Sequence, residues 1–349
     1  MTAASTGFDA RGRRASPGPE RNVTAANLRQ RLEAALARRA ALLSDPQTTV
    51  ARLVHGAADG LTGLVIERLG AVLIAQLHPG PGALPEVAAH ELCVAAAESV
   101  GATAVYRKVF PPDRSRLPAE AAAAHQSPTP WWGTPAPPEY PVREAGLTYL
   151  VRPYDGLATG LFLDHRVNRA RVRRLAAGRC VLNAFAYTGA HSVCAAAGGA
   201  RVIYTLDISR KALAWARANL AANALPPAEH HFVCEDAAAF CRRAARRGQR
   251  FELVILDPPT FARTRRPTRV FQIQRDLPDL VAAALPLVAR DGHLLLSINH
   301  RATPARRLAK IVRTAARELG RRVRVEPVPL PEDFAGDPEY AKTVSVELS

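Results

Sequence analysis

The sequence predicts an α/β protein: a Rossmann-like, doubly wound sheet with a C-terminal β-hairpin, preceded by a smaller α+β domain. Between residues 179 and 259, short apolar segments alternate with helix-like runs, which is the pattern of a parallel sheet with crossover helices. Each apolar segment ends in a polar or small residue. Because the carboxyl ends of parallel strands line the ligand crevice of such sheets, we expect these residues to form a binding site.

Length and composition allow two domains, each with its own core. The chain has 349 residues, of which 48% are hydrophobic. Residues 1–25 are rich in Arg, Gly, Ser and Pro, so we expect a disordered basic tail. We expect residues 26–138 to form a helix and a small α+β domain, and residues 139–349 to form the larger sheet domain.

The chain is strongly basic, and its basic residues cluster. The net charge is +16, from 47 Lys and Arg against 31 Asp and Glu. The runs RVRR, RRAARRGQR, ARTRRPTR and RRLAKIVR all fall in the second half. A GC-rich genome and solvated helix faces explain part of this bias, whereas a phosphate-binding surface explains the clustering better. The charge therefore favours a polyanionic partner.

Several classes of protein are disfavoured. No apolar run is long enough to span a membrane, and the N-terminus lacks the apolar segment of a signal peptide, so we expect a cytoplasmic protein. The five cysteines are scattered without CxxC spacing, which is typical of reduced, buried thiols. His230 and His231 are adjacent and would point to opposite faces of a strand, so we expect no metal site.

The first domain is predicted from its turns and apolar periodicity. A helix should begin near Asn27 and end before Pro46, and strands separated by DG and LG turns should follow over residues 49–77. A helix in LPEVAAHELCVAAAESVG and a strand in AVYRKVF come next. Residues 111–141 are Pro-rich and predict an irregular surface connection. Within it, Trp131 and Trp132 either cap a domain junction, which is the blander interpretation, or stack on bases.

The second domain should open with a hairpin that turns at Ala145 and Gly146, followed by a loop and a helix in GLATGLFLDHRVNRARVRRLAAG. The apolar segments predict sheet strands at about residues 180–184, 201–207, 230–235, 251–257 and 293–297. Helices are expected at about residues 191–197, 210–222, 237–246, 273–288 and 304–319. The segments RRVRVEPV and KTVSVEL should close the chain as two further strands.

Three strand ends together indicate a nucleoside-shaped ligand. NAFAYTG forms the turn after the first strand, but its single Gly189 is a weak fingerprint, and an ordinary tight turn would look the same. Asp207 ends the next strand, where an acidic residue can accept hydrogen bonds from ribose hydroxyls. Asp236 follows the third strand and could accept from the amino group of adenine, or could simply cap a helix.

The segment DPPTF ends the fourth strand and predicts a second ligand beside the first. Two successive prolines fix the backbone and remove its donors, so the neighbouring groups are held rigidly at the sheet edge. The carboxylate of Asp257 can accept from an amino or imino group of a base, and the ring of Phe261 can stack on its face. A plain strand stop is the alternative interpretation.

Read together, GLATGLFLDHR, NAFAYTG, LDIS and LDPPTFARTRRPTRVFQIQRD resemble the S-adenosylmethionine-dependent 23S rRNA large-subunit methyltransferases. The resemblance extends from Asp155 to the C-terminus, and RLVHGAADGLTGLVIERLG is similar to the small central domain of that family. It implies a class I methyltransferase fold, S-adenosylmethionine as cofactor, RNA as partner and an RNA-binding first domain. The basic N-terminus does not resemble the PUA domain that several relatives carry.

The resemblance also implies roles for individual residues. Asp257, Pro258, Phe261 and Asn299 would position the target base, with a turn residue as the alternative for Asn299. Asp164 and Arg166 would close one side of the cofactor pocket, with a purely structural salt bridge as the alternative. The full set implied to bind the cofactor is Asp164, Arg166, Asn183, Phe185, Tyr187, Thr188, Gly189, Asp207, Ile208, Asp236 and Asp257.

Two branches of the family differ in the atom that they methylate. Cytosine C5 is a poor nucleophile and needs covalent attack by a cysteine thiolate, but this chain has no cysteine after Cys241. Guanine N7 already carries a lone pair and needs only alignment. We therefore favour guanine N7 of 23S rRNA. The alternatives are cytosine C5, methylation of a protein or small molecule, and a catalytically silent RNA-binding factor in ribosome assembly.

Overall fold

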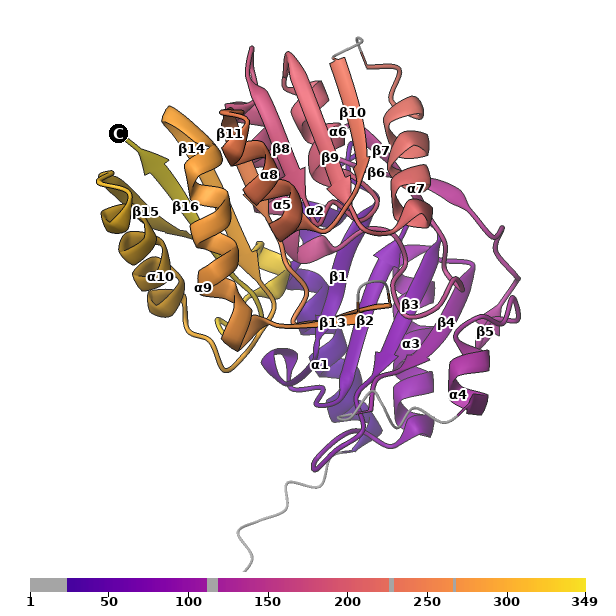
Figure 1. The fold of residues 1–349 in the computed structure, drawn as a ribbon. Helices are drawn as coiled ribbons and strands as arrows, with labels where there is room; N and C mark the ends of the chain where they lie inside the picture. Colours follow the sequence, from indigo (N-terminus) through magenta and orange to yellow (C-terminus); the bar gives the residue numbers. More distant parts are fainter. Residues whose placement is uncertain (1–23, 112–118, 226–228, 266–267) are drawn as a thin grey trace, which may run out of the picture.

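The structure is a computed structural model that describes residues 24–111, 119–225, 229–265 and 268–349. Most of the expected basic tail lies outside these residues. Within them, no helix combines the length and the apolar character that crossing a membrane requires. Two sheets organise the chain, one in each half, and both are visible in Figure 1.

The first sheet has five strands in the order β1-β2-β3-β4-β5. Its strands are β1 (Val50–His55), β2 (Leu64–Leu69), β3 (Val72–Leu77), β4 (Ala104–Val109) and β5 (Trp132–Gly133). Helices α1 (Ala25–Arg38) and α3 (Glu86–Val100) share a core with it, and α2 (Ala40–Leu43) and α4 (Ala119–Ala124) are short. The predicted strands and turns are confirmed. The first predicted helix breaks at Arg39, whose buried guanidinium binds Asp59.

The second sheet has seven strands in the order β10-β9-β8-β11-β14-β16-β15. They are β8 (Cys180–Ala184), β9 (Val202–Asp207), β10 (Glu229–Cys234), β11 (Phe251–Leu256), β14 (Val288–Ile298), β15 (Val323–Val328) and β16 (Lys342–Leu348). The first five are parallel, whereas β16 runs antiparallel to β14 and β15. This confirms the Rossmann-like fold and its terminal antiparallel pair.

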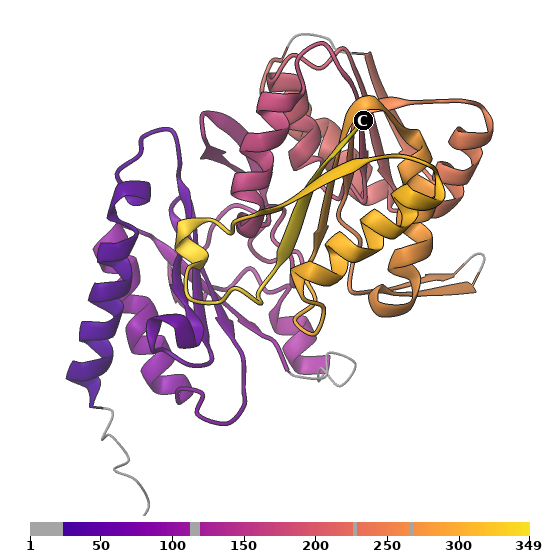
Figure 2. The same ribbon diagram turned by 90° about the vertical axis from the view of Figure 1, so that its left-hand side faces the viewer.

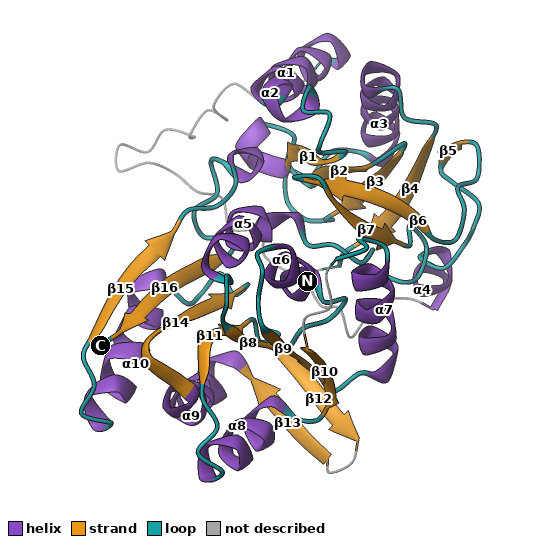
Figure 3. Ribbon diagram, turned by 90° about the horizontal axis from the view of Figure 1, so that it is seen from above, coloured by secondary structure: helices purple, strands orange, loops and turns teal. Residues whose placement is uncertain are grey.

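Helices cover both faces of the second sheet (Figures 1 and 3). On one face α8 (Ala237–Arg246), α9 (Ile273–Ala284) and α10 (Ala305–Glu318) enclose an apolar core that includes Phe240, Leu277 and Val312. On the other face pack α5 (Arg166–Leu175), α6 (Ala190–Ala197) and α7 (Arg210–Ala221). The helices follow from amphipathic runs with side-chain caps at Ser209 and Asp236.

Three details differ from the sequence prediction. An antiparallel pair, β12 (Phe261–Arg265) and β13 (Thr268–Gln272), follows the DPPT segment where no strand was expected. Helix α9 was predicted to reach residue 288, but it ends at Ala284, and a 3₁₀ turn (Leu285–Leu287) with Pro286 leads into β14. The Pro-rich connection contains α4 and β5, and Trp131 and Trp132 pack against the core of the first sheet.

The carboxyl ends of the parallel strands face the first sheet (Figure 1). The hairpin β6 (Tyr140–Glu144) and β7 (Leu147–Val151) turns at Ala145 and Gly146 as predicted, and it packs between the sheets. The short 3₁₀ turns η3 (Leu163–His165) and η5 (Glu332–Phe334) both contact β1. Figure 2 shows the loop that carries η5 lying against the first sheet. The edge that should bind ligands therefore lies between the two halves.

Candidate functional site

The sheet order arranges the predicted site residues along one edge. Neighbouring parallel strands lie about 4.8 Å apart, so their carboxyl ends form a row. Asp236 follows β10, Asp207 ends β9, the turn that contains Gly189 follows β8, Asp257 follows β11, and Asn299 follows β14. The row therefore runs from the residue proposed for adenine, through those for ribose and methionine, to those for the target base.

The turn between β8 and α6 has a strained backbone. Phe185 and Tyr187 have φ values of 60° and 49°, in a region that residues with a Cβ rarely adopt. Gly189 has φ 73°, and a Cβ placed there would lie 2.7 Å from the Cβ of Ala216. Such conformations cost on the order of 1–3 kcal/mol each and are found where the backbone must approach a ligand. The turn thus packs closely against α7 at Gly189, and its strained backbone makes it a candidate for contact with a ligand.

Two side chains of this turn are engaged inside the protein. Asn183 is buried and donates to the hydroxyl of Ser192 at 2.9 Å, and the hydroxyl of Thr188 donates to the carbonyl of Gly160 at 2.6 Å. These contacts tie the turn to α6 and to the loop before η3. Cofactor binding by Asn183 and Thr188 stays a prediction. Because both side chains make hydrogen bonds inside the protein, the backbone of the turn is the better candidate for contact with a cofactor.

Asp207 fixes the neighbouring loops with its carboxylate. One oxygen accepts from the backbone N–H of Tyr187 at 2.9 Å, and the other accepts from that of Ser209 at 2.8 Å. Each carboxylate oxygen can accept a second hydrogen bond. Asp207 can therefore hold the turn in place and still accept from hydroxyl groups of a ligand.

Three large apolar side chains are exposed at this edge. Ile208 is 53% exposed, Phe162 51% and Phe261 58%, although large apolar groups elsewhere in the described chain are mostly buried. The ring centroids of Phe162 and Tyr187 lie 5.3 Å apart. Exposed apolar surface beside polar groups is typical of a binding site. Of the three, Phe162 was not predicted from the sequence, although it stands in the GLFLDHR motif.

Asp236 is the N-cap of α8. Its Oδ1 accepts from the backbone N–H of Ala239 at 2.9 Å, which is the capping alternative raised from the sequence. Capping of α8 is thus one role of Asp236. Contact with adenine stays a prediction.

Asp257 and Asn299 form the far end of the row. The side chain of Asp257 is 28% exposed, and its Oδ2 lies 3.4 Å from Nε2 of His165. Desolvation raises the pKa of Asp257; nearby His165 lowers it, and Asp164 raises it further. The hydroxyl of Thr260 donates to the carbonyl of Asn299 at 2.6 Å, so the two strand-end loops are joined. Pro258 is buried behind them.

Arg166 lies in a different environment from the rest of the predicted set. Its guanidinium binds Glu144 at 3.1 Å, Asp333 at 2.6 Å and the carbonyl of Val50 at 3.1 Å. No ion pair between Asp164 and Arg166 occurs in the described chain. Asp164 is buried and lies close enough to Asp257 to affect its charge. The structural alternative for Arg166 thus has direct support in its contacts, although the salt bridges are with Glu144 and Asp333.

His165 is the main site residue that the sequence reasoning missed. It stands between Asp164 and Arg166 in the FLDHR motif, so its position was the available signal. It is buried, and it contacts Asp257, Asn168 and His191. In the residues that the structure describes, no group of three or more His, Cys, Asp or Glu side chains is arranged to hold a metal ion.

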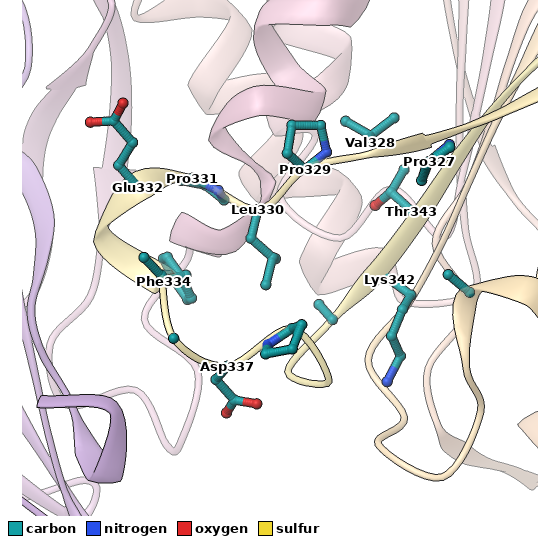
Figure 4. A pocket seen from close by; sticks show the side chains of 15 residues that line it. Pro327, Val328, Pro329, Leu330, Pro331, Glu332, Phe334, Asp337, Lys342 and Thr343 are labelled. Carbon is teal, nitrogen blue, oxygen red and sulfur yellow. The ribbon is translucent and has the colours of Figure 1, made fainter. Parts of the chain in front are cut away.

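A cavity of about 470 Å³ lies apart from this edge, beneath the loop between β15 and β16 (Figure 4). Its walls are mainly apolar, with Val328, Leu330 and Phe334, and Asp337 and Lys342 lie at its border. None of the residues predicted for cofactor or base lines it. The chemistry predicted from the sequence therefore belongs to the carboxyl edge.

Comparisons with known proteins show which family and which relatives the sequence of this chain matches. The profile of the S-adenosylmethionine-dependent methyltransferase family matches residues 120–342. "Ribosomal RNA large subunit methyltransferase K/L" of Syntrophotalea carbinolica is 41% identical over 46% of this chain and 22% of its own length. "Ribosomal RNA large subunit methyltransferase K" of Neisseria meningitidis serogroup B is 39% identical over 47% of this chain and 46% of its own. The chain thus spans less than half the length of these curated relatives.

Among solved structures, the protein SMU.776 in complex with SAH superimposes with a TM-score of 0.78. It is 26% identical, and the match covers 93% of this chain and 81% of that one. A second structure, of a SAM-dependent methyltransferase from Streptococcus mutans, has a TM-score of 0.77 at 23% identity and covers 96% and 83% of the two chains. Both halves of this chain are therefore included in the structural likeness.

Proposed function

The chain belongs to the S-adenosylmethionine-dependent methyltransferase family, and from this premise we propose that it methylates a base of RNA, with N7 of a guanine in 23S rRNA as the favoured target. S-adenosylmethionine is the cofactor of the family. The single observation that carries the choice of base is the position of the cysteines relative to Asp257. Three further observations support the rest of the proposal. They are the residues that fit the cofactor, the residues that could orient the base and a basic surface that could bind RNA.

The residues at β8 and β9 fit S-adenosylmethionine. Gly189 lets the turn pack closely against Ala216 of α7, Ile208 presents an apolar surface suited to an adenine ring, and Asp207 keeps acceptor capacity for ribose hydroxyls. When bound, S-adenosylmethionine supplies an electrophilic methyl group. The positive-φ turn at Phe185 and Tyr187 brings backbone groups close to where the methionine end would lie.

The cysteines argue against cytosine C5. Cys234 is the exposed one, but it ends β10, which is separated from β11 by β9 and β8. Three strand spacings place it about 14 Å from the strand that carries Asp257. Cys180 is half-buried at the amino end of β8, and Cys93, Cys194 and Cys241 are buried in helices. No thiolate is thus placed to attack C6 of a base at Asp257, whereas N7 of guanine requires none.

At the base side, this chain's residues bind and orient. Guanine presents N1–H and N2–H donors, which match the two acceptor oxygens of a carboxylate such as that of Asp257. Phe261 offers an exposed ring for stacking, and Asn299 lies exposed on the loop that Thr260 ties to this site. Alignment of a nucleophilic nitrogen with the methyl group is sufficient for the reaction. We therefore assign no general base.

RNA as the substrate is supported by charge and by relatives. Arg306, Arg307, Lys310, Arg313 and Arg317 are all exposed on α10, and none forms an ion pair with a described residue. Like charges three or four positions apart destabilise a helix by about 0.2–0.5 kcal/mol per pair, so folding alone does not favour this pattern. A polyanion would neutralise it. The two curated relatives described above are named as ribosomal RNA methyltransferases.

Mass-spectrometric nucleoside analysis of RNA from a deletion strain tests the proposal. We expect 7-methylguanosine to be lost from large-subunit RNA and restored by the wild-type chain but not by the Asp257→Asn variant. Loss of 5-methylcytidine instead would show that the cysteine argument is wrong.

A labelling experiment tests the substrate class. Purified protein with methyl-labelled S-adenosylmethionine should label ribosomal RNA in a cell extract treated with protease, and not in one treated with ribonuclease. Label found only in protein or in metabolites would overturn the RNA assignment. Binding of RNA without any labelled product would favour the assembly-factor alternative.

A further inference from the structure

We propose that His165 is a positioning residue that holds Asp257 as an oriented, ionised acceptor for the substrate base. This rests on the proposed role of Asp257 at the base side. His165 lies on η3 and has its Nε2 3.4 Å from Oδ2 of Asp257. His165 is buried, being only 7% exposed, whereas the Asp257 side chain is 28% exposed.

The neighbours of His165 define which of its nitrogens carries the proton. Nδ2 of Asn168 lies 3.2 Å from Nδ1 of His165, and Nε2 of His191 lies 3.3 Å from the same Nδ1. An amide nitrogen can only donate, so Nδ1 of His165 is an acceptor in this arrangement. In a neutral imidazole the proton then resides on Nε2. The N–H of a neutral His165 is therefore on Nε2, the ring nitrogen that lies 3.4 Å from Oδ2 of Asp257.

The protonation of His191 agrees with a proton on Nε2 of His165. Burial lowers the pKa of His191 well below its usual value, so the ring is neutral. Its Nδ1 is buried and makes no hydrogen bond in the described structure, as expected of an unprotonated nitrogen, and its Nε2 then carries the proton that points at His165. The single lone pair on Nδ1 of His165 can thus accept from Asn168 or from His191, and with either donor the proton of His165 is on Nε2, 3.4 Å from Oδ2 of Asp257.

The imidazole is anchored by the sheet itself. Nδ2 of Asn168 also lies 2.9 Å from the hydroxyl of Thr343 on β16 and 3.3 Å from that of Ser297 on β14. These two hydroxyls lie 2.9 Å apart. An amide group has two N–H donors, so Asn168 joins the imidazole to the second sheet. A rigid support of this kind is what precise orientation of a site residue requires.

The charges around Asp257 show why a donor matters there. Desolvation raises the pKa of Asp257, His165 lowers it, and Asp164, also on η3, raises it further. His191 on α6 contacts the imidazole through Nδ1, and the charge of Arg169 on α5 acts on His191. Loss of the donor would leave two influences that favour the protonated acid. A protonated carboxyl group would lose an acceptor site that the N1–H and N2–H donors of guanine require.

Single-turnover methyl transfer at saturating S-adenosylmethionine tests the role of His165. The variants are His165→Ala, His165→Gln, whose amide N–H can replace the Nε2 donor, and His231→Ala as a control at a half-buried histidine on β10. For His165→Ala we expect a rate constant at saturating RNA about 10- to 100-fold lower at pH 7, and an acid limb of the pH profile moved to higher pH. His165→Gln should recover most of the rate, and the control should match the wild type.

A second measurement needs no activity. In protein labelled with ¹³C at aspartate side chains, the resonance absent from Asp257→Asn reports the titration of Asp257. We expect its pKa to be higher in His165→Ala than in the wild type or in His165→Gln. An unchanged titration together with an unchanged pH profile in His165→Ala would overturn the inference, as would a His165→Gln variant as impaired as His165→Ala. If the wild type binds S-adenosylmethionine but methylates no RNA, the proposed function fails, and the titration still decides the His165–Asp257 contact.

Discussion

Two polar regions meet at η3 and differ in how completely their groups are paired. The first, here called the interface network, joins the two halves of the chain through Arg52, Glu144, Arg166, Arg169 and Asp333. Glu144 accepts from Arg169 at 2.6 Å and from Arg166 at 3.1 Å. Asp333 accepts from Arg166 at 2.6 Å and from the backbone N–H of Arg52 at 2.8 Å. Each buried charge in it has an opposite charge or a backbone partner.

The second region is the carboxyl edge of the seven-stranded sheet. There the backbone is strained at Phe185 and Tyr187, Ile208 and Phe261 are exposed, and the side chain of Asp257 is partly exposed. Its groups retain acceptor capacity and apolar surface that the protein does not use. A region whose groups are fully paired stabilises the fold, whereas one with unused capacity is available to ligands. Arg166, expected from the resemblance to bind cofactor, has its contacts in the first region.

The largest effect is expected from breaking the interface network. Glu144→Ala leaves the buried guanidinium of Arg169 without its carboxylate and leaves Arg166 with Asp333 alone, which should lower the free energy of unfolding by about 3–5 kcal/mol. Urea denaturation measures this. Glu326→Ala, which removes an exposed pair with Arg324, is the matched control and should change stability by less than about 0.5 kcal/mol. Equal losses in both variants would mean that pairing in the network has no special weight.

At Asp257 we expect the opposite result from Glu144, namely a large effect on activity and little or no loss of stability. Asp257→Asn should reduce methyl transfer about 100-fold while leaving stability equal or higher. The pKa of Asp257 is raised in the folded protein, so the ionised carboxylate lowers stability as pH rises from about 3.8 through that pKa. Asparagine removes this contribution and can still accept from His165. Thermal unfolding at pH 5 and pH 8 measures it, and a clear loss of stability at pH 8 would place Asp257 with the network instead.

A smaller effect is expected at Asp207. Asp207→Ala should weaken S-adenosylmethionine binding about 10- to 100-fold, because a hydrogen bond to a charged group contributes roughly 1.5–3 kcal/mol. Isothermal titration calorimetry measures the affinity, with the exposed Asp279→Ala on α9 as control. Unchanged affinity in Asp207→Ala would remove the ribose assignment, and the strained turn would then be the remaining support for the cofactor site.

The smallest effect at neutral pH concerns His55, beside the interface network. Burial, and next the charge of Arg52, lower the pKa of His55 to about 4. The folded protein therefore binds fewer protons than the unfolded chain, and stability should fall as pH drops from about 6.5 toward 4. In His55→Gln the fall should be shallower, because glutamine does not titrate. Parallel pH profiles of the unfolding midpoint in both proteins would contradict this cause.

The sequence was sufficient where the signal is local. The apolar segments and helical runs of the second half predicted the five parallel strands, and Asp207 and Asp257 lie at strand ends as expected, because the carboxyl ends of parallel strands share one edge. The β12–β13 pair was missed because ARTRRPTR has neither apolar alternation nor a recognisable turn signal. The capping contact of Asp236 and a ligand contact have the same sequence signature, so both interpretations remained open.

By itself, the sequence determined the fold class, the polar residues at the ends of the strands and the absence of a cysteine beyond Cys241, because these depend on local pattern and residue type. Only the tertiary structure decided which charges are paired. Arg166 meets Asp333, and Asn168 meets Thr343, across most of the second half of the chain. Such contacts leave no periodic trace in a sequence, because they depend on how distant elements pack. The same packing places His165 next to Asp257, although the sequence reasoning had predicted only its two neighbours, Asp164 and Arg166, as site residues.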